Sequence, residues 1–136
     1  MRVAVVDDDP LLVKALGLLL TDEPALRFVG GAFTVADGIA LVARRQPDVL
    51  LVDVRMPVGG GVAVVSQARE LAPRTVIVAM SATDDPDARV EMAEAGAAGY
   101  MVKNVDMADL LHTIDEAGHA CGDPTSPLPC CPPRSP

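Results

Sequence analysis

Aromatic and basic side chains are scarce in this sequence of 136 residues, and tryptophan is absent. Lysine and arginine number 11 against 19 acidic residues, which gives a formal net charge of −8. Such a charge argues against direct binding to DNA and to anionic membranes, since both need clustered basic side chains. Apolar runs are too short to span a bilayer, and the N-terminal MRVAVVDDD turns acidic before a signal peptide could form.

Cysteine is also rare, and all three copies lie near the C-terminus, at Cys121, Cys130 and Cys131. An odd number outside the apolar part of the chain predicts no disulfide framework and favours a reducing, cytoplasmic setting. Residues 119–136 hold half of the chain's 12 prolines, so we expect a disordered, proline-rich tail there. Residues 1–118 are expected to form one domain.

Short apolar stretches alternate five times with stretches of helical periodicity. We expect strands at residues 2–6, 26–30, 48–52, 75–80 and 98–102. We expect helices at residues 10–20, 35–46, 61–72, 84–96 and 106–117. Strictly alternating strands and helices with short loops predict an α/β fold, in which a doubly wound, five-stranded parallel sheet carries helices on both faces. The abundance of valine, alanine and leucine suits a sheet closely covered by helices.

Three of the expected helices begin with recognisable start signals. Asp9 followed by Pro10 is a typical N-cap and first-turn pair. Thr34 with Asp37 three residues later resembles a capping box. Thr83 is the expected cap of the helix that follows the fourth strand, which leaves Ser81 free for another role.

Polar side chains follow four of the five strands. Asp7 and Asp8 follow the first, Asp53 the third, Ser81 the fourth and Lys103 the fifth. The carboxyl ends of parallel strands share one edge of a sheet, so these side chains should converge there. Three carboxylates need a counter-charge, and oxygen-only ligands favour Mg²⁺ or Mn²⁺. With a hydroxyl and an ammonium added, the set predicts a phosphoryl-transfer site.

Four motifs occur in order at these strand ends, namely VVDDDP, LLVDVRMPVGGG, VIVAMSA and GYMVK. Together they resemble the receiver domain of bacterial two-component response regulators, the CheY-like superfamily, over residues 1–118. Asn104 after the lysine, where the family often has proline, resembles the NarL/FixJ-type subfamily. The resemblance implies a flavodoxin-like (βα)5 fold with strand order 2-1-3-4-5.

The resemblance also implies roles for the residues around the predicted metal. Asp53 matches the aspartate that takes phosphate from a sensor histidine kinase. Asp8 and Asp53 match direct Mg²⁺ ligands, Asp7 a ligand through water, and Arg55 the residue whose backbone carbonyl completes the protein ligands. Ser81 and Lys103 match the hydroxyl and the lysine that contact the phosphoryl group.

Further matches concern the switch and the loop after the phosphorylated strand. Tyr100 matches the aromatic residue that turns inward when the hydroxyl of Ser81 moves. Phosphorylation is thereby expected to reshape an interaction face, with a homodimer or a downstream effector protein as partner and transcription control as outcome. The loop matches are Met56, Pro57 and Gly61.

Two other functions remain open at this point. A small aspartyl-nucleophile phosphatase would also use Mg²⁺, and Asp7 with Asp9 has the spacing of its acids, although so short a chain has little to close the site. A pseudo-receiver would bind a partner without phosphate. We expect a switch with at most autodephosphorylation rather than an enzyme, and too few residues follow the last helix to fold a DNA-binding domain.

Overall fold

The computed structural model describes residues 1–56, 60–103 and 107–122, in which strands and helices alternate along the chain. The strands are β1 (Arg2–Val6), β2 (Arg27–Ala32), β3 (Val49–Asp53), β4 (Val76–Ser81) and β5 (Gly99–Val102). The helices are α1 (Pro10–Thr21), α2 (Val35–Arg45), α3 (Gly60–Leu71), α4 (Pro86–Ala95) and α5 (Met107–Gly122).

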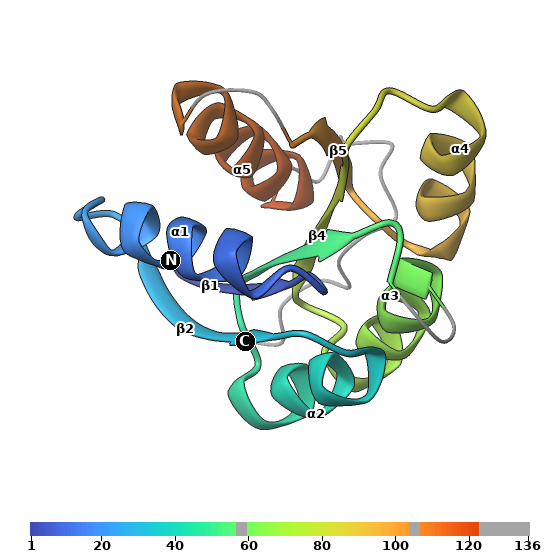
Figure 1. The fold of residues 1–136 in the computed structure, drawn as a ribbon, viewed down its shortest axis with the longest axis horizontal. Helices are drawn as coiled ribbons and strands as arrows, with labels where there is room; N and C mark the ends of the chain where they lie inside the picture. The colour runs from blue at the N-terminus through green and yellow to red at the C-terminus, as the bar shows by residue number, and fades with distance from the viewer. Residues whose placement is uncertain (57–59, 104–106, 123–136) are drawn as a thin grey trace.

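The five strands form one parallel sheet in the order β2-β1-β3-β4-β5 (Figure 1). This confirms the predicted α/β class and the strand order that the resemblance implied. The order reverses direction between β1 and β3, and ligands of such sheets bind beyond the strands' carboxyl ends near this point. The register pairs Val6 with Val52 and Asp53 with Met80, so the ends of β1, β3 and β4 lie at one level.

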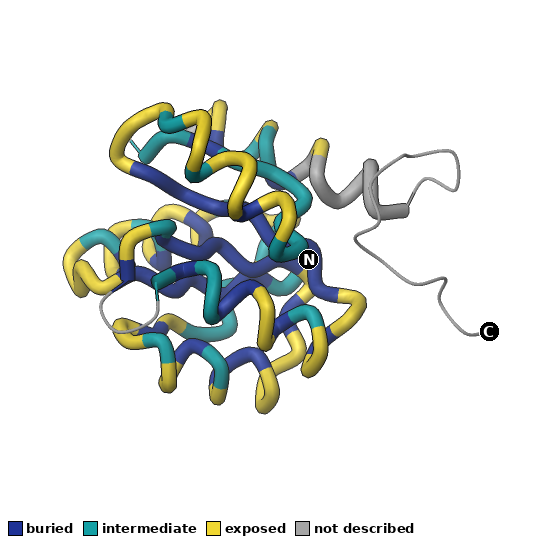
Figure 2. The backbone as a smooth tube through the Cα atoms, turned by 90° about the vertical axis from the view of Figure 1, so that its right-hand side faces the viewer, coloured by how far each residue is buried: buried dark blue, intermediate teal, exposed yellow. Residues whose placement is uncertain are grey.

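Helices cover both faces of the sheet, with α1 and α5 on one face and α2, α3 and α4 on the other (Figure 1). Side chains alternate along β1, where Ala4 and Val6 face the second set of helices and Val3 and Val5 the first. All five residues of β3 are buried, as expected for a central strand covered on both faces. Figure 2 shows the buried strands between the partly exposed outer helices.

The second strand is displaced from its predicted position at residues 26–30, because β2 continues through both glycines to Ala32. Its pairing with β1 shifts by one residue, since Val3 pairs with Phe28 and Ala4 pairs with Gly30, which leaves Val29 without a partner in the register. At Gly31 a side chain would overlap that of Val13 on α1. Glycine at this point lets the helix pack closely on the strand.

The predicted cap of α1 is confirmed, because Asp9 accepts a hydrogen bond from the backbone N–H of Leu11 at 3.0 Å. Thr34 likewise caps α2 by accepting from the N–H of Asp37 at 3.1 Å. The prediction for α4 was wrong, since its N-cap is Asp85 rather than Thr83. Pro86 occupies the first turn, and its fixed φ and missing N–H suit that position, so the helix starts later than predicted.

The last helix, α5, runs to Gly122 and therefore past its predicted end at Ala117. The first residues of the expected tail, 119–122, are thus helical, and the rest of the tail lies outside the described residues. No helix in the described part of the chain is long and apolar enough to cross a membrane.

Candidate functional site

Two buried carboxylates stand at the carboxyl edge of the sheet. Asp7 follows β1 directly, and its N–H donates to Ala32 O at 3.0 Å, which extends the pairing with β2. Asp53 is the last residue of β3, and the N–H of Val54 donates to Met80 O at 2.8 Å. Asp7 is 0% and Asp53 4% exposed. The continued strand pairing therefore fixes the backbone beneath both carboxylates.

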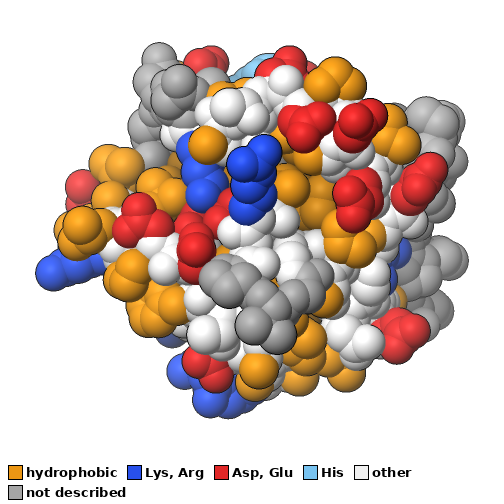
Figure 3. Space-filling view, turned by 45° about the vertical axis from the view of Figure 1, so that its right-hand side comes forward, with side chains coloured by type: hydrophobic (Ala, Val, Ile, Leu, Met, Phe, Trp, Pro, Cys, Tyr) orange, Lys and Arg blue, Asp and Glu red, His pale blue; other side chains and the backbone are white. Residues whose placement is uncertain are grey.

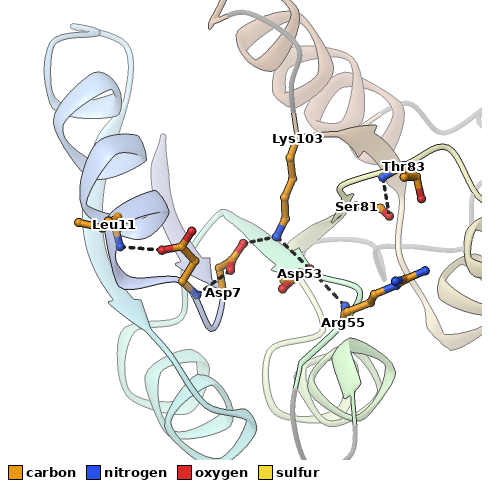
Figure 4. Close-up of polar contacts among 8 residues, drawn as sticks. Asp7, Leu11, Asp53, Arg55, Ser81, Thr83 and Lys103 are labelled. Atoms are coloured by element: carbon orange, nitrogen blue, oxygen red, sulfur yellow. Dashed lines mark hydrogen bonds and ion pairs between the residues drawn. The ribbon is translucent and has the colours of Figure 1, made fainter.

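Lys103 joins these two carboxylates, and its aliphatic chain reaches across the end of the sheet toward them (Figure 4). Its Nζ lies 2.7 Å from Oδ2 of Asp7 and 3.1 Å from Oδ1 of Asp53. The backbone N–H of Lys103 donates to Ser81 O at 2.7 Å, so β4 positions the lysine. Figure 3 shows basic side chains among acidic ones near the middle of this face. The predicted convergence of both acids and the lysine is present.

Burial perturbs the acid–base properties of this cluster. Burial and the neighbouring charge of Asp7 raise the pKa of Asp53 above 3.8, against the opposing effects of the Arg55 N–H and of Lys103. Burial alone would lower the pKa of Lys103, but hydrogen bonding and attraction to the two carboxylates outweigh it and raise that pKa above 10.5.

Both raised pKa values favour the folded state at lower pH, but they act in different pH windows. Folding tightens proton binding at Asp53, so the contribution of this group to the free energy of unfolding is present below pH 3.8 and is lost as the pH rises through its raised pKa. The contribution of Lys103 is complete at neutral pH and is lost only as the pH rises above 10.5.

The acids at this edge have the composition of a site for a hard cation. Oxygens of Asp7, Asp8 and Asp53 all lie within 4.8 Å of one another, and Asp8 is exposed. Three carboxylates and one ammonium leave two negative charges, which is the charge that a divalent cation neutralises. Apart from its ion pair with Lys103, Asp7 Oδ2 has no hydrogen-bond partner in the described part of the chain. Oxygen-only ligands with one under-coordinated buried oxygen fit Mg²⁺.

Ser81 lies at the same edge but is turned away from the carboxylates (Figure 4). It ends β4, is 3% exposed, and its Oγ accepts from the N–H of Thr83 at 3.3 Å. This long hydrogen bond leaves the hydroxyl proton available as a donor. If Ser81 moved toward Asp53, its Oγ would lose only this long hydrogen bond from the Thr83 N–H.

Tyr100 belongs to a neighbouring group rather than to the acidic cluster. It lies on β5, packs partly buried against the core beside α4, and donates its hydroxyl to Thr83 O at 3.2 Å. The guanidinium of Arg89 on α4 sits 4.6 Å from the centre of its ring. Our reading of the sequence missed Arg89, because no local spacing relates a helix residue to an aromatic residue on the following strand.

The loop after β3 is described only in part. The N–H of Arg55 donates to Asp53 Oδ1 at 3.2 Å, and Met56 is buried in the core. Pro57 lies outside the described residues. Gly61 is in the first turn of α3 rather than in the loop, and its N–H donates to Val54 O at 3.0 Å.

A side chain at Gly61 would overlap the carbonyl oxygen of Asp53. Because the obstacle is backbone, we expect Gly61→Ala to lower the free energy of unfolding by about 3 kcal/mol, measured by chemical denaturation. Gly17→Ala on α1 is the matched control. There a new Cβ meets the Phe28 ring at 2.8 Å, and a ring can move. A loss at Gly61 no larger than at Gly17 would contradict this reading.

The sheet order and the acidic edge together define the class of CheY-like α/β domains. The profile of the response regulator receiver domain family matches residues 3–115. The chain therefore belongs to this family, whose members are the receiver domains of two-component response regulators. Receiver domains are switches rather than enzymes, and the family generally uses Mg²⁺ at an acidic site.

Individual relatives agree with this assignment. The chain is 32% identical over 114 residues to response regulator GacA of Pseudomonas viridiflava, covering 84% of this chain and 53% of that protein. It is 30% identical over 115 residues to nitrate/nitrite response regulator NarL of Escherichia coli K12, covering 85% of this chain and 53% of that protein. The chain thus spans about half the length of these relatives.

A solved structure agrees as well. The signal receiver domain of the putative response regulator NarL from Mycobacterium tuberculosis superposes with a TM-score of 0.79 at 30% identity. The match covers 87% of this chain and 95% of that one, so the whole receiver fold is shared.

Proposed function

We propose that this chain is a phosphorylation-controlled switch in which Asp53 accepts a phosphoryl group from a sensor histidine kinase. The observation that carries the proposal is the convergence of Asp7, Asp8, Asp53 and Lys103 at one edge of the sheet. Membership in the receiver family supports the same reaction. The resulting output is transcription control through a partner, because the relatives that match include transcription regulators.

The arrangement of Asp53 suits a nucleophile. The Arg55 N–H and Lys103 both contact Oδ1, so neither contact uses Oδ2. Oδ2 attacks the phosphorus and forms a P–O bond, while the bond from phosphorus to the donor's histidine nitrogen breaks. The leaving nitrogen keeps the electron pair and takes a proton from solvent. Lys103 then contacts the transferred phosphoryl oxygens, and Ser81 donates its hydroxyl proton to one of them.

The acidic residues give the proposed cofactor site. Asp8 and Asp53 would hold Mg²⁺ or Mn²⁺ directly, Asp7 through water, and the backbone carbonyl of Arg55 would complete the protein ligands. When bound, the ion supplies positive charge that lowers repulsion between the carboxylates and the incoming phosphoryl oxygens. The charge balance of the cluster supports a divalent ion over a monovalent one.

The proposed output is a change of the face formed by α4, β5 and α5. Movement of Ser81 toward the phosphoryl group alters the loop that Tyr100 contacts through Thr83, and a ring shift would follow. The proposed partners are the kinase and either a second copy of the chain or a downstream effector protein. We propose no direct DNA contact by these residues, because the net charge is −8.

The test is incubation with acetyl phosphate and Mg²⁺, followed by intact mass measurement. We expect one added phosphate per chain, none when EDTA replaces Mg²⁺, and loss of the phosphate on treatment with hydroxylamine, which cleaves acyl phosphates. Continuous release of phosphate from an unrelated phosphate ester would instead favour the aspartyl phosphatase. No added phosphate with Mg²⁺ present would favour a pseudo-receiver and contradict the proposal.

A further inference from the structure

Tyr100 is held from two directions at once. Its hydroxyl donates to Thr83 O at 3.2 Å, which ties it to the loop between β4 and α4. Its ring face lies 4.6 Å from the Arg89 guanidinium, which ties it to α4. Both contacts require the same ring position, which we call the Tyr100 seat: the place between Thr83 and Arg89. A cation over an aromatic face is attractive and adds to the hydroxyl contact.

Arg89 is itself oriented by an acid. One of its guanidinium nitrogens lies 2.9 Å from Asp84 Oδ1 in the loop that precedes α4. This ion pair spans the loop and the helix, and its side chains are 51% and 66% exposed. Solvent weakens such a pair, so its main effect is to restrict where the guanidinium plane lies rather than to stabilise the fold.

We propose that Arg89 is a positioning residue that holds Tyr100 in its seat, so that α4 helps to set the equilibrium of the tyrosine switch. The proposal deepens the proposed function and rests on it wherever phosphorylation is concerned. The occupancy of the seat itself does not depend on phosphate. Arg89 links the end of the phosphorylation pathway to the exposed surface of α4, and a partner that contacts Arg89 would thereby alter the freedom of Tyr100.

The chain offers a direct measurement, since Tyr100 is its single tyrosine and it has no tryptophan. Tyrosine fluorescence and its quenching by acrylamide therefore report on this ring alone. Without Arg89 the ratio of displaced to seated ring should rise about two- to fivefold, as expected for loss of one exposed cation–π contact. We expect Arg89→Gln to increase the quenching constant in Mg²⁺-free buffer without any phosphodonor.

Two further variants separate positioning from general effects on folding. Arg89→Lys keeps a cation near the ring and should restore part of the protection from quenching. Arg44→Gln, an exposed arginine in the last turn of α2, should quench like the wild type. Circular dichroism of each variant checks the fold. Equal quenching constants for Arg89→Gln and wild type would contradict the role of Arg89.

A second arm adds acetyl phosphate and Mg²⁺ to wild type and to Arg89→Gln. Phosphorylation turns the ring inward, so it should lower the quenching constant more in Arg89→Gln than in wild type, because the unphosphorylated ring of the variant is less confined. An equal change in both proteins would contradict the role of Arg89. A wild-type chain that takes up no phosphate would contradict the proposed function instead, so the two failures are distinct.

Discussion

We expect Asp53→Asn to remove phosphorylation while leaving the fold intact. Asparagine has the shape of aspartate and keeps an oxygen that accepts from the Arg55 N–H at the end of β3. It has no anionic oxygen to attack phosphorus, so the rate of phosphate uptake should fall on the order of a thousandfold or more. Intact mass after incubation with acetyl phosphate and Mg²⁺ measures this directly.

The matched control is Asp22→Asn, which changes an exposed aspartate at the C-terminal end of α1. This variant should take up phosphate like the wild type. Thermal unfolding should show that Asp53→Asn is folded, and in Mg²⁺-free buffer at neutral pH it should be no less stable than wild type. The reason is that burial raises the pKa of Asp53, so ionising it in the folded protein is unfavourable. Phosphate uptake by Asp53→Asn at the wild-type rate would remove Asp53 from the proposed mechanism.

The alternation of strands and helices was predictable because burial on both faces leaves continuous apolar stretches such as VLLVD in β3. The boundaries of β2 were not, because a glycine pair reads as a turn when the packing of Val13 against it is unknown. The predicted cap of α4 was wrong because the sequence offers several residues that could cap this helix. Thr83, Asp84 and Asp85 are all acceptable caps, and only the position of Pro86 in the helix selects among them.

The acidic edge could be predicted from topology alone, since parallel strands bring their carboxyl ends together whatever the loop sequences are. The seat of Tyr100 could not. Its two contacts come from Thr83 and Arg89, which precede it on a loop and a helix whose relative placement depends on tertiary packing. The need for glycine at position 61 could not be predicted either, because the contact with the Asp53 carbonyl oxygen arises only from the close packing of α3 on β3.

Lys103→Met is expected to lower the stability of the fold through unbalanced charge. Asp7 and Asp53 are buried and share the ammonium of Lys103, so its removal leaves two carboxylates facing each other without a counter-charge. At neutral pH without Mg²⁺ the free energy of unfolding should fall on the order of 3 kcal/mol. That is the low end for a broken buried ion pair, and it is appropriate because the lysine side chain is 21% exposed.

Two conditions should reverse this loss if charge is its cause. Mg²⁺ should stabilise Lys103→Met more than wild type, because the ion then neutralises carboxylates that wild type pairs with lysine. Acid should also reduce the difference, since the Asp53 carboxyl, whose pKa burial raises above 3.8, no longer needs the ammonium once it is protonated. Lys14→Met, at an exposed lysine on α1, is the control and should respond to neither. A loss in Lys103→Met that is the same with and without Mg²⁺, and at acid as at neutral pH, would indicate lost packing of the lysine stem instead.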